Sequence, residues 1–526
     1  MGSVDVAMAR RSVLASVALP LLGAGVTMLL PGCASAPAAS GDPLRSGVDA
    51  KDLALLNRLT WGIDSATLQA WGSGSRRDYL QRQLHPDLSA PLPAKVMSQI
   101  DGSGLRSKPM MSWITDMEQR RRDADAQVDD DAKKAAQQAY QQDMNRLARD
   151  AAAQSLFRAL YSPNQLQEQL TWFWFNHFNV HQYKSNLRAM VGDYEDVLRA
   201  RALGRFRDLL IASATHPAMI RYLDNEQNAA NRINENYARE VMELHTLGVE
   251  GGYAQKDVQE LARVLTGLGI NFGDRTPNLK PAQQALYVRQ GATEFNPARH
   301  DMGAKLVLGQ AVAGLGWVEI IEQLTRLARE PATAHHVSRQ LAIYFVADNP
   351  APEVVERMTR AFLASDGDIA VTLQAMFDAP EFAASLTHRF KDPVHYVVSA
   401  VRLAYDGKTI INPAPMLGWL NRLGEGLYNR QTPDGYPLDE AAWSSSGQMN
   451  TRFEVARAIG SNSAGLFRGD VPNAVDTPAF PQLSNALYYD HLSRALGERT
   501  RRALDAATSA TEWNVLLLSS PEFMYR

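Results

Sequence analysis

The stretch DNEQNAANRINENYAREVMELHTLGVEGGYAQKDVQELARVLTGLGINF, residues 224–272, decides how the chain folds. It joins a helix rich in amides and carboxylates, a turn with three glycines, and a second helix that ends in Thr266 and Gly267. Two helices joined by such a turn within about fifty residues are typical of an αα-hairpin. We therefore predict a helical hairpin here, and we expect part of any chemical site to lie on it.

The first helix of this hairpin, residues 234–247, is amphipathic. At about 100° per residue, one face carries polar side chains and the opposite face carries mainly apolar ones. The polar face holds Glu235, Asn236, Arg239, Glu240 and Glu243. The opposite face holds Tyr237, Ala238, Val241, Met242, Leu244 and His245. The wheel therefore predicts that His245 is a core histidine with one satisfied ring nitrogen.

Two interpretations of the polar face stay open. Glu235, Arg239 and Glu243 follow the i, i+4, i+8 spacing of a solvated face, in which each ion pair contributes about 0.2–0.5 kcal/mol. Alternatively, an internal cavity is faced by Asn234, Asn236, Glu240 and Glu243, and Arg239 keeps the carboxylates ionised as ligands or bases. Only the second interpretation gives these residues a chemical role.

Residues 1–33 are predicted to be a signal peptide. Arg10 and Arg11 precede an uncharged apolar run over residues 12–30, which is followed by Pro31-Gly32-Cys33. Cys33 stands where a bacterial lipobox places the lipidated residue, although Pro31 is a less usual occupant of its position. The two arginines resemble a twin-arginine export signal. We expect a protein anchored by lipid in the cell envelope, on the periplasmic side or in the outer membrane.

Composition excludes several classes of chemistry. Cys33 is the one cysteine of the 526 residues, so the mature chain has no disulfide, no thiolate metal site and no cysteine nucleophile. A net charge of −3 without a basic run argues against a nucleic-acid partner. The proportions of 45% hydrophobic and 21% charged residues are those of an ordinary globular protein.

The domain organisation follows from changes in composition. Residues 34–49 form a flexible tether rich in Pro, Ser, Gly and Ala, and residues 50–526 form a single large helical domain. Within it, residues 113–160 alternate in charge and predict a projecting solvated helix pair, whereas residues 273–310 are an irregular segment with β-prone pieces. The predicted fold class is mainly α, a large multi-helix domain with a few short strands in an irregular central insertion.

A second candidate site lies on an aromatic helix. Ser162-Pro163 is typical of a helix start and opens the run NQLQEQLTWFWFNHFNVHQ. His177 shares a face with Leu170 and Phe173, and His181 follows one turn later. Two imidazoles at this spacing can share a metal ion, but an aromatic-rich helix is also typical of a core.

Several pieces of the chain resemble a large family of bacterial exported proteins, the domain-of-unknown-function family 1800. The pieces are LLNRLTWG, WFWFNHF, RFRDLLIASATHPAMIRYLDN, NENYAREVMELHTLGVEGGY, KDVQELARVLTG, FNPARHDMGAKLVLG, FVADNP, TPDGYP and LLLSSPEFMYR. The NENYARE…LHTLG and HD-x-G-x-K pieces are the most specific. The family name does not specify an activity.

The resemblance implies a set of characteristic polar positions. They are Asn176, His177, His216, Asp224, Asn225, Asn234, Glu235, Asn236, Arg239, Glu240, Glu243, Thr266, Gly267, His300, Asp301 and Lys305. The chain departs from the family pattern where relatives often carry a second histidine, at Phe175. It also departs where they often carry a threonine before the second hairpin helix, at Ala254, and where many carry an aromatic residue, at His245.

Two function classes follow, and the first is a water-activating, hydrolase-like envelope enzyme acting on a glycan, ester or phosphoester. Its expected catalytic residues are His177, Glu240, Glu243 and Asp301. Its expected substrate-binding residues are Asn176, Asn236, Arg239 and Lys305. A divalent metal is a candidate cofactor, with His177, Glu240, Glu243 and His300 as candidate ligands.

The second class is a non-catalytic assembly or escort lipoprotein whose polar motifs are buried hydrogen-bond networks. The resemblance also implies a possible partner, an exported protein of sulfatase-like fold. A site shared by the expected catalytic residues would favour the enzyme.

Lipidation at Cys33 can be tested by fractionation. The parent protein is expected to partition with membranes, whereas Cys33→Ala should be soluble in the exported fraction or remain an uncleaved precursor. Replacing Arg10 and Arg11 by lysines should separately block export through the twin-arginine route. If the parent and Cys33→Ala both fractionate as soluble protein, the lipobox prediction is wrong.

Overall fold

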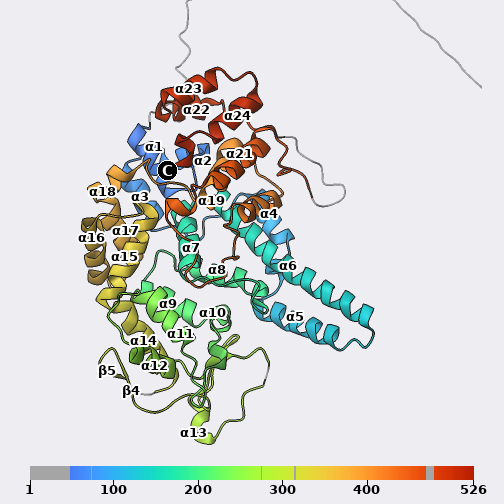
Figure 1. Ribbon diagram of the computed structural model, residues 1–526, viewed down its shortest axis with the longest axis vertical. Helices are drawn as coiled ribbons and strands as arrows, with labels where there is room; N and C mark the ends of the chain where they lie inside the picture. Colours follow the sequence, from blue (N-terminus) through green and yellow to red (C-terminus); the bar gives the residue numbers. More distant parts are fainter. Residues whose placement is uncertain (1–47, 73, 274, 313–314, 470–478) are drawn as a thin grey trace, which may run out of the picture. The chain divides into compact units, whose positions relative to one another are not determined.

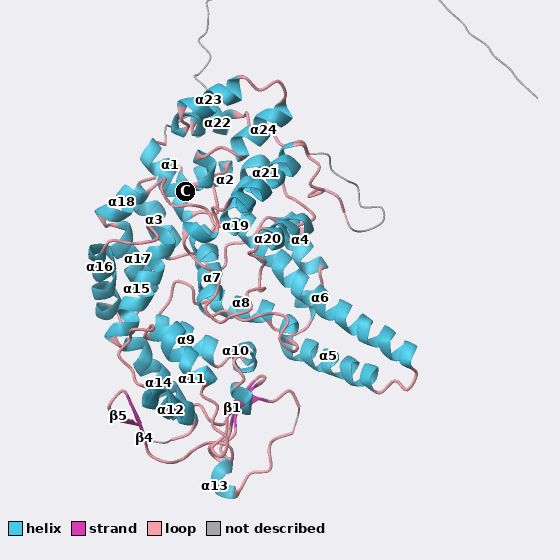
Figure 2. Cartoon of the chain, viewed as in Figure 1, coloured by secondary structure: helices cyan, strands magenta, loops and turns pink. Residues whose placement is uncertain are grey.

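Helices dominate the computed structural model, which describes residues 48–72, 74–273, 275–312, 315–469 and 479–526 (Figures 1 and 2). The predicted signal peptide with Cys33 and most of the predicted tether lie outside the described residues. Many helices begin at a side chain that accepts a hydrogen bond from the first turn. Such caps are Asp49, Asp64, Ser75, Asp129, Asp368, Asp392, Ser445, Asn485 and Ser509. Proline stands in the first turn of other helices, such as those that begin at Pro217, Pro331, Pro352 and Pro380.

The N-terminal part of the domain leads into a long helix pair. Its first helices are α1 (Ala50–Leu59), α2 (Ser65–Trp71), α3 (Arg76–Leu84) and α4 (Ala94–Gly102). The pair consists of α5 (Met110–Asp125) and α6 (Asp130–Tyr161), which pack side by side (Figure 1). The buried residues of α6 begin at Tyr140, so its first turns are solvated, as the alternating charges predict.

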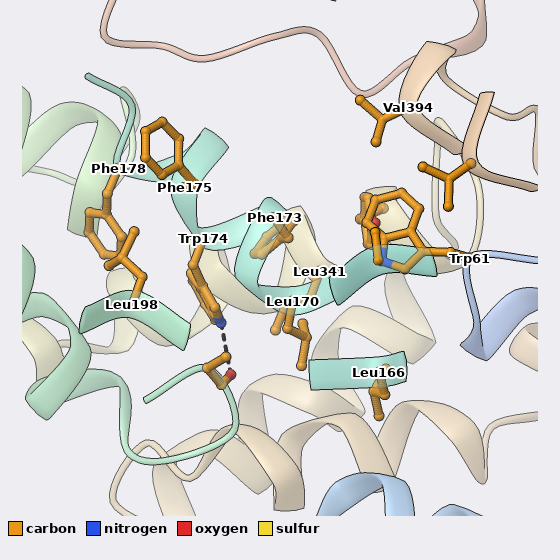
Figure 3. Close-up of a cluster of buried hydrophobic side chains, with 14 of the residues drawn as sticks. Trp61, Leu166, Leu170, Phe173, Trp174, Phe175, Phe178, Leu198, Leu341 and Val394 are labelled. Atoms are coloured by element: carbon orange, nitrogen blue, oxygen red, sulfur yellow. Dashed lines mark hydrogen bonds between the residues drawn. The ribbon is translucent and has the colours of Figure 1, made fainter. Parts of the chain in front are cut away.

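Helix α7 (Gln165–His177) lies at the centre of the core. It buries residues on every face, including Leu166, Leu170, Phe173 and Trp174 (Figure 3). The indole Nε1 of Trp174 donates to a backbone carbonyl at 2.9 Å, so its polar atom is satisfied. The next helices are α8 (Val191–Arg199), α9 (Phe206–Ala214) and α10 (Pro217–Tyr222).

The predicted hairpin is present, with one change. Helix α11 (Asn236–Glu240) continues as a π-helical turn, η5 (Val241–Thr246), and the second helix is α12 (Gln255–Val264). The amide of Leu247 donates to the carbonyl of Met242 at 2.8 Å, which is the five-residue spacing of a π-turn. Burial otherwise follows the predicted wheel: Tyr237, Ala238, Val241, Met242 and His245 are buried, and the polar face is partly exposed.

The strands are short, as the sequence predicts. Antiparallel strands β1 (Leu268–Ile270), β3 (Thr293–Phe295) and β2 (Val288–Gln290) form one sheet in that order. Strands β4 (Lys305–Val307) and β5 (Gln310–Val312) form a hairpin, and α13 (Pro281–Gln284) lies between β1 and β2 in sequence. The predicted fold class, mainly α with a few short strands, is confirmed.

The remaining chain is helical. Its helices are α14 (Trp317–Arg329), α15 (Pro331–Phe345), α16 (Pro352–Ala364), α17 (Ile369–Phe377), α18 (Pro380–Ser385), α19 (Pro393–Ala404), α20 (Ala414–Arg422), α21 (Ser446–Gly460), α22 (Ala486–Asp490), α23 (Glu498–Asp505) and α24 (Ala510–Leu518). Residues 43–526 cluster as one unit, and a continuous hydrophobic core runs through its described residues. None of the described helices has the length and apolar character needed to cross a membrane.

The start of α12 offers a stability test. Ala254 occupies the N-cap with extended backbone (φ −104°, ψ 165°) and no side-chain cap, and its amide already donates to Asp257 at 2.8 Å. Ala254→Thr should therefore complete the cap and raise the free energy of unfolding by about 1 kcal/mol. Denaturant unfolding measures this gain. Ala254→Val, which adds the same branch without the hydroxyl, should show no gain, and equal stabilisation by both variants would refute the capping argument.

Candidate functional site

The site is a polar cleft of about 320 Å³ that lies between the end of α7, helix α15 and the loop after α20. Its lining residues are Phe173, Asn176, His177, Leu244, His336, Gln340, Ile343, Asp348, Asp434, Tyr436, Pro437, Leu438 and Asp439. Imidazoles, amides and carboxylates from four separate segments therefore meet at one place. Of the residues predicted from sequence, only Asn176 and His177 line it.

Two imidazoles of the cleft are fixed by the end of the π-turn. The Nε2 of His177 lies 3.2 Å from the carbonyl oxygen of His245, and the Nε2 of His336 lies 3.2 Å from that of Leu244. A carbonyl only accepts, so each Nε2 carries the hydrogen and donates. Carbonyls at a helix C-terminus lack partners within the helix, and these two imidazoles provide them.

The three clustered histidines are held neutral. The ring centroid of His177 lies 6.2 Å from that of His245 and 6.1 Å from that of His336. Burial lowers the pKa of His177 well below its usual value, and charge on either neighbouring imidazole would lower it further. Burial also lowers the pKa of His336, and it lowers that of His245 to about 3. At neutral pH, the cleft therefore carries uncharged imidazoles.

His245 is a core residue, as the helical wheel predicts. Its residue exposure is 1%, and its Nε2 has no hydrogen-bond partner in the part of the chain that the structure describes. Its carbonyl, rather than its ring, takes part in the site by accepting from His177. A larger aromatic side chain at this position would keep that carbonyl in place.

The carboxylates of the hairpin helix divide into two kinds. Glu235 is bound on the surface, where Arg239 (3.3 Å) and Gln255 (2.6 Å) both donate to its Oε2. The prediction of a solvated ion pair thus describes Glu235 and Arg239, and Arg239 is engaged there rather than free for a substrate. Glu240 differs, because it is partly buried and no ion pair or hydrogen bond engages its carboxyl among the described residues.

The environment of Glu240 favours its protonated form. Burial raises the pKa of this carboxyl, as do the charges of Glu243 and Asp434, whereas Arg239 opposes the rise. The Glu243 Oε2 lies 3.5 Å from the hydroxyl of Tyr253, a long hydrogen bond. Glu240 and Glu243 are therefore electrostatically coupled. The charge of Asp434, which lines the cleft, also acts on Glu240.

Asn176, which was predicted to bind substrate, lines the cleft and holds its loop in place. Its Oδ1 accepts from the amide of Tyr436 at 2.6 Å, and its Nδ2 donates to the carbonyl of the same residue at 2.9 Å. Gly435 makes this approach possible, since its φ is +74° and a Cβ there would lie 2.2 Å from the Asn176 carbonyl oxygen. Both the Oδ1 and the Nδ2 of Asn176 thus form hydrogen bonds with the backbone of the TPDGYP loop.

Asn236 is exposed and caps local backbone. Its Nδ2 donates to the carbonyl of Leu223 at 3.2 Å, and its amide donates to the Oδ1 of Asn234 at 3.1 Å. These bonds close the turn that leads into α11. The structure therefore gives Asn236 a structural partner and does not place it on the cleft lining.

His300, Asp301 and Lys305 belong to a different, buried cluster. The His300 Nε2 lies 3.3 Å from Glu319 Oε2, and the Lys305 Nζ lies 2.7 Å from Glu319 Oε1, with all three side chains fully buried. The Asp301 carboxylate is paired with Arg263 at 2.7 Å. Lys305 is therefore inaccessible and ion-paired in the structure, and it does not line the cleft.

The predicted metal set is not assembled as one group. His177 contacts the imidazoles of the cleft, whereas His300 contacts Glu319, and the described residues contain no group of three or more His, Cys, Asp or Glu side chains arranged to hold a metal ion. His181 cannot share a metal with His177 across a helical turn either. Helix α7 ends at His177, so the i+4 relation that the sequence suggested is absent.

The sequence interpretation did not select five polar residues of the cleft. They are His336, Gln340, Asp348, Asp434 and Asp439. Asp348 and Asp434 lie in FVADNP and TPDGYP, two pieces that the family resemblance had already selected. Those pieces are short loop motifs without periodicity, so a helical wheel gives them no role.

The fold and the cleft together define a mainly helical protein with a polar, carboxylate-rich site between loops and helix ends. The chain belongs to the family described as protein of unknown function (DUF1800), whose family model matches residues 54–525. No curated protein and no solved structure is similar enough to the chain to match it.

The neutral histidines predict a pH dependence of stability. Their folded pKa values lie below about 6.5, the value in an unfolded chain, so this stability is present above about pH 6.5 and is lost as the pH falls toward the folded pKa. The expected loss is about 1.4 kcal/mol per pH unit for each such histidine. His245→Phe should fold. Between pH 6.5 and 5, its free energy of unfolding should depend less steeply on pH than that of the parent, by the contribution of one histidine.

Urea unfolding at several pH values measures these slopes. The control is His85→Phe at the end of α3, because His85 is exposed and lies outside the histidine cluster. The control should leave the slope unchanged. A slope that is the same in the parent and in His245→Phe would contradict the burial of a neutral imidazole.

Proposed function

We propose that the protein is an exported, lipid-anchored hydrolase that cleaves a glycan where the cleft meets the hairpin helix, with Glu240 of that helix as the general acid and Asp434 of the cleft lining as the general base or nucleophile. The single observation behind this assignment is the state of Glu240, a partly buried carboxyl with a raised pKa and no ion-pair or hydrogen-bond partner among the described residues. A carboxyl that stays protonated to higher pH can deliver a proton to a leaving oxygen.

Asp434 has the opposite environment. Its carboxylate lies 3.0 Å from the Arg430 guanidinium, and the Thr432 hydroxyl also donates to it. Both contacts hold the carboxylate as a hydrogen-bond acceptor, which is the role needed in a base or nucleophile. Two carboxyls with such different surroundings are the recurring arrangement of acid–base hydrolysis.

Tyr222 connects the two carboxyls. Burial raises the pKa of its phenol, and the negative charges of Asp434 and Glu240 raise it further, so both carboxyls lie within electrostatic reach of this ring. Its hydroxyl donates to the carbonyl of Gln431 at 2.8 Å. The same bond ties the backbone just before the TPDGYP loop, which carries Asp434, to α10.

The charge of the cleft supports a neutral substrate. Asp348, Asp434 and Asp439 line it, and its imidazoles are neutral because their pKa values are lowered. Among the described residues, no lysine or arginine lines the cleft to bind a phosphoester, because Arg389 and Arg430 lie outside the lining and are paired with Asp348 and Asp434. Of the three substrate classes expected from sequence, a glycan with hydroxyls that the Asp, Gln and His side chains can bind is favoured.

The acid role is tested by removing the charge and keeping the shape. Glu240→Gln should fold normally and should reduce the hydrolysis of nitrophenyl glycosides or peptidoglycan by about 10²–10⁴-fold, the usual contribution of general acid–base catalysis. Asp434→Asn should have a similar effect. The matched control is Glu235→Gln on the same polar face, where the carboxylate is tied to Arg239, and it should keep its rate.

The pH profile supplies a second readout. Because Glu243 raises the pKa of Glu240, Glu243→Gln should move the alkaline limb of the rate to lower pH, and Arg239→Gln should move it to higher pH. Glycoside cleavage that is absent, or that is unaffected by Glu240→Gln and Asp434→Asn, would refute the proposal. That result would favour the escort class.

A further inference from the structure

A second cavity of about 530 Å³ lies between α1, α19 and the C-terminal segment, and it shares no lining residue with the cleft. Figure 1 shows the C-terminus beside α1. Most of the wall is apolar and includes Leu53, Ala54, Ile63, Leu403, Leu496 and Phe523. Its volume falls within the range of about 300–1,000 Å³ that is usual for small-molecule sites.

One cationic side chain lines this apolar cavity. Lys391 is 3% exposed, and its backbone is fixed, because its amide donates to Met524 (2.8 Å) and its carbonyl accepts from Arg452 (2.7 Å). The Nζ lies 3.8 Å from the centroid of the Phe523 ring. In the part of the chain that the structure describes, no carboxylate forms an ion pair with this amine and no hydrogen bond engages it.

The carboxylates around Lys391 accept hydrogen bonds from other groups. Asp392 binds the His395 ring at 2.7 Å, and Glu425 accepts from the amide of Val394 at 2.9 Å. Glu522, which lines the cavity, accepts from the amide of Gly497 at 2.7 Å and from the hydroxyl of Thr500 at 2.8 Å. The protein therefore leaves the amine without a counter-ion of its own.

The nearest charges make the amine harder to protonate. Burial lowers the pKa of Lys391 to about 7, and the positive charges of Arg452 and Arg526 contribute to the shift. A buried cation is unfavourable unless it is paired, so an anionic ligand would gain from meeting this amine in the charged form. The apolar wall would at the same time receive an aliphatic tail.

We propose that this cavity binds an aliphatic carboxylate such as a medium-chain fatty acid, with the carboxylate on Lys391 Nζ and the tail against α1 and α19. This site is independent of the proposed glycan hydrolysis. The ion pair raises the affinity of Lys391 for a proton, so binding above pH 7 takes up a proton from solution.

The test is calorimetric titration of the full-length protein with decanoate and with decan-1-ol, which has the same tail and no charge. The parent should bind decanoate at least tenfold more tightly than decanol. At pH 8, titration in buffers of different ionisation enthalpy should show the uptake of up to one proton per decanoate. Lys391→Met should weaken decanoate at least tenfold, abolish proton uptake and leave decanol within threefold.

Two further variants keep the test decisive. Lys51→Met removes an exposed lysine of α1 and should bind as the parent does. Ala54→Phe fills the cavity from α1 and should lose both ligands, which tests the cavity even if Lys391→Met fails to fold. Absence of decanoate binding, equal affinity for decanoate and decanol in the parent, or undiminished binding by Ala54→Phe would overturn the proposal.

Discussion

The polar side chains of α7 lie on a helix that is buried on every face, so each needs a partner where water does not reach. Gln165 accepts from the amide of Trp61, Gln169 donates to the carbonyl of Arg58, and Gln167 donates to that of Arg199. At the far end, Asn176 and His177 bind the cleft loop and the π-turn. Segments far apart in sequence are thus fixed to one helix by hydrogen bonds that are costly to leave unmade.

The same constraint explains much of the polar signature of the family. Asn225 donates to the carbonyls of Leu265 and Leu268, and Asn228 donates to that of Ala262, so two buried amides close the end of α12. His216 caps the start of α10 through its Nδ1 at 3.1 Å. Such residues specify packing in a large helical core. Many of the amides and histidines of this signature therefore form their hydrogen bonds with backbone groups.

Periodicity predicted the fold well where one face of an element meets the core. The helical hairpin and its buried face, including His245, follow from apolar residues at spacings of three and four, and the short strands follow from β-prone pieces within an irregular segment. The π-turn was not predicted from periodicity, because a turn that holds one extra residue has no distinctive residue types in the sequence. The end of α7 at His177 was likewise hidden, since the helix-like pattern continues to His181.

The site was predicted only in part, for a related reason. Glu240 and His177 were selected from helices, but the partners that complete the cleft, Asp434 and His336, come from a loop and from another helix that the fold alone brings together. Their proximity depends on Asn176 and Tyr222 holding the loop backbone, and no spacing in the sequence encodes those contacts.

In a core where most polar groups have structural partners, the groups without them carry the most information about chemistry. Lys305 and His300 are buried with Glu319, and removing one member of such a network costs roughly 3–5 kcal/mol because it leaves a charge or a polar atom unpaired. Glu240 and Lys391 differ from them. Each is an ionisable side chain with a shifted pKa, beside or lining a cavity, and neither contributes a hydrogen bond or an ion pair that the described fold needs. Stability does not explain such groups, so a ligand or a reaction is the better physical reason for them.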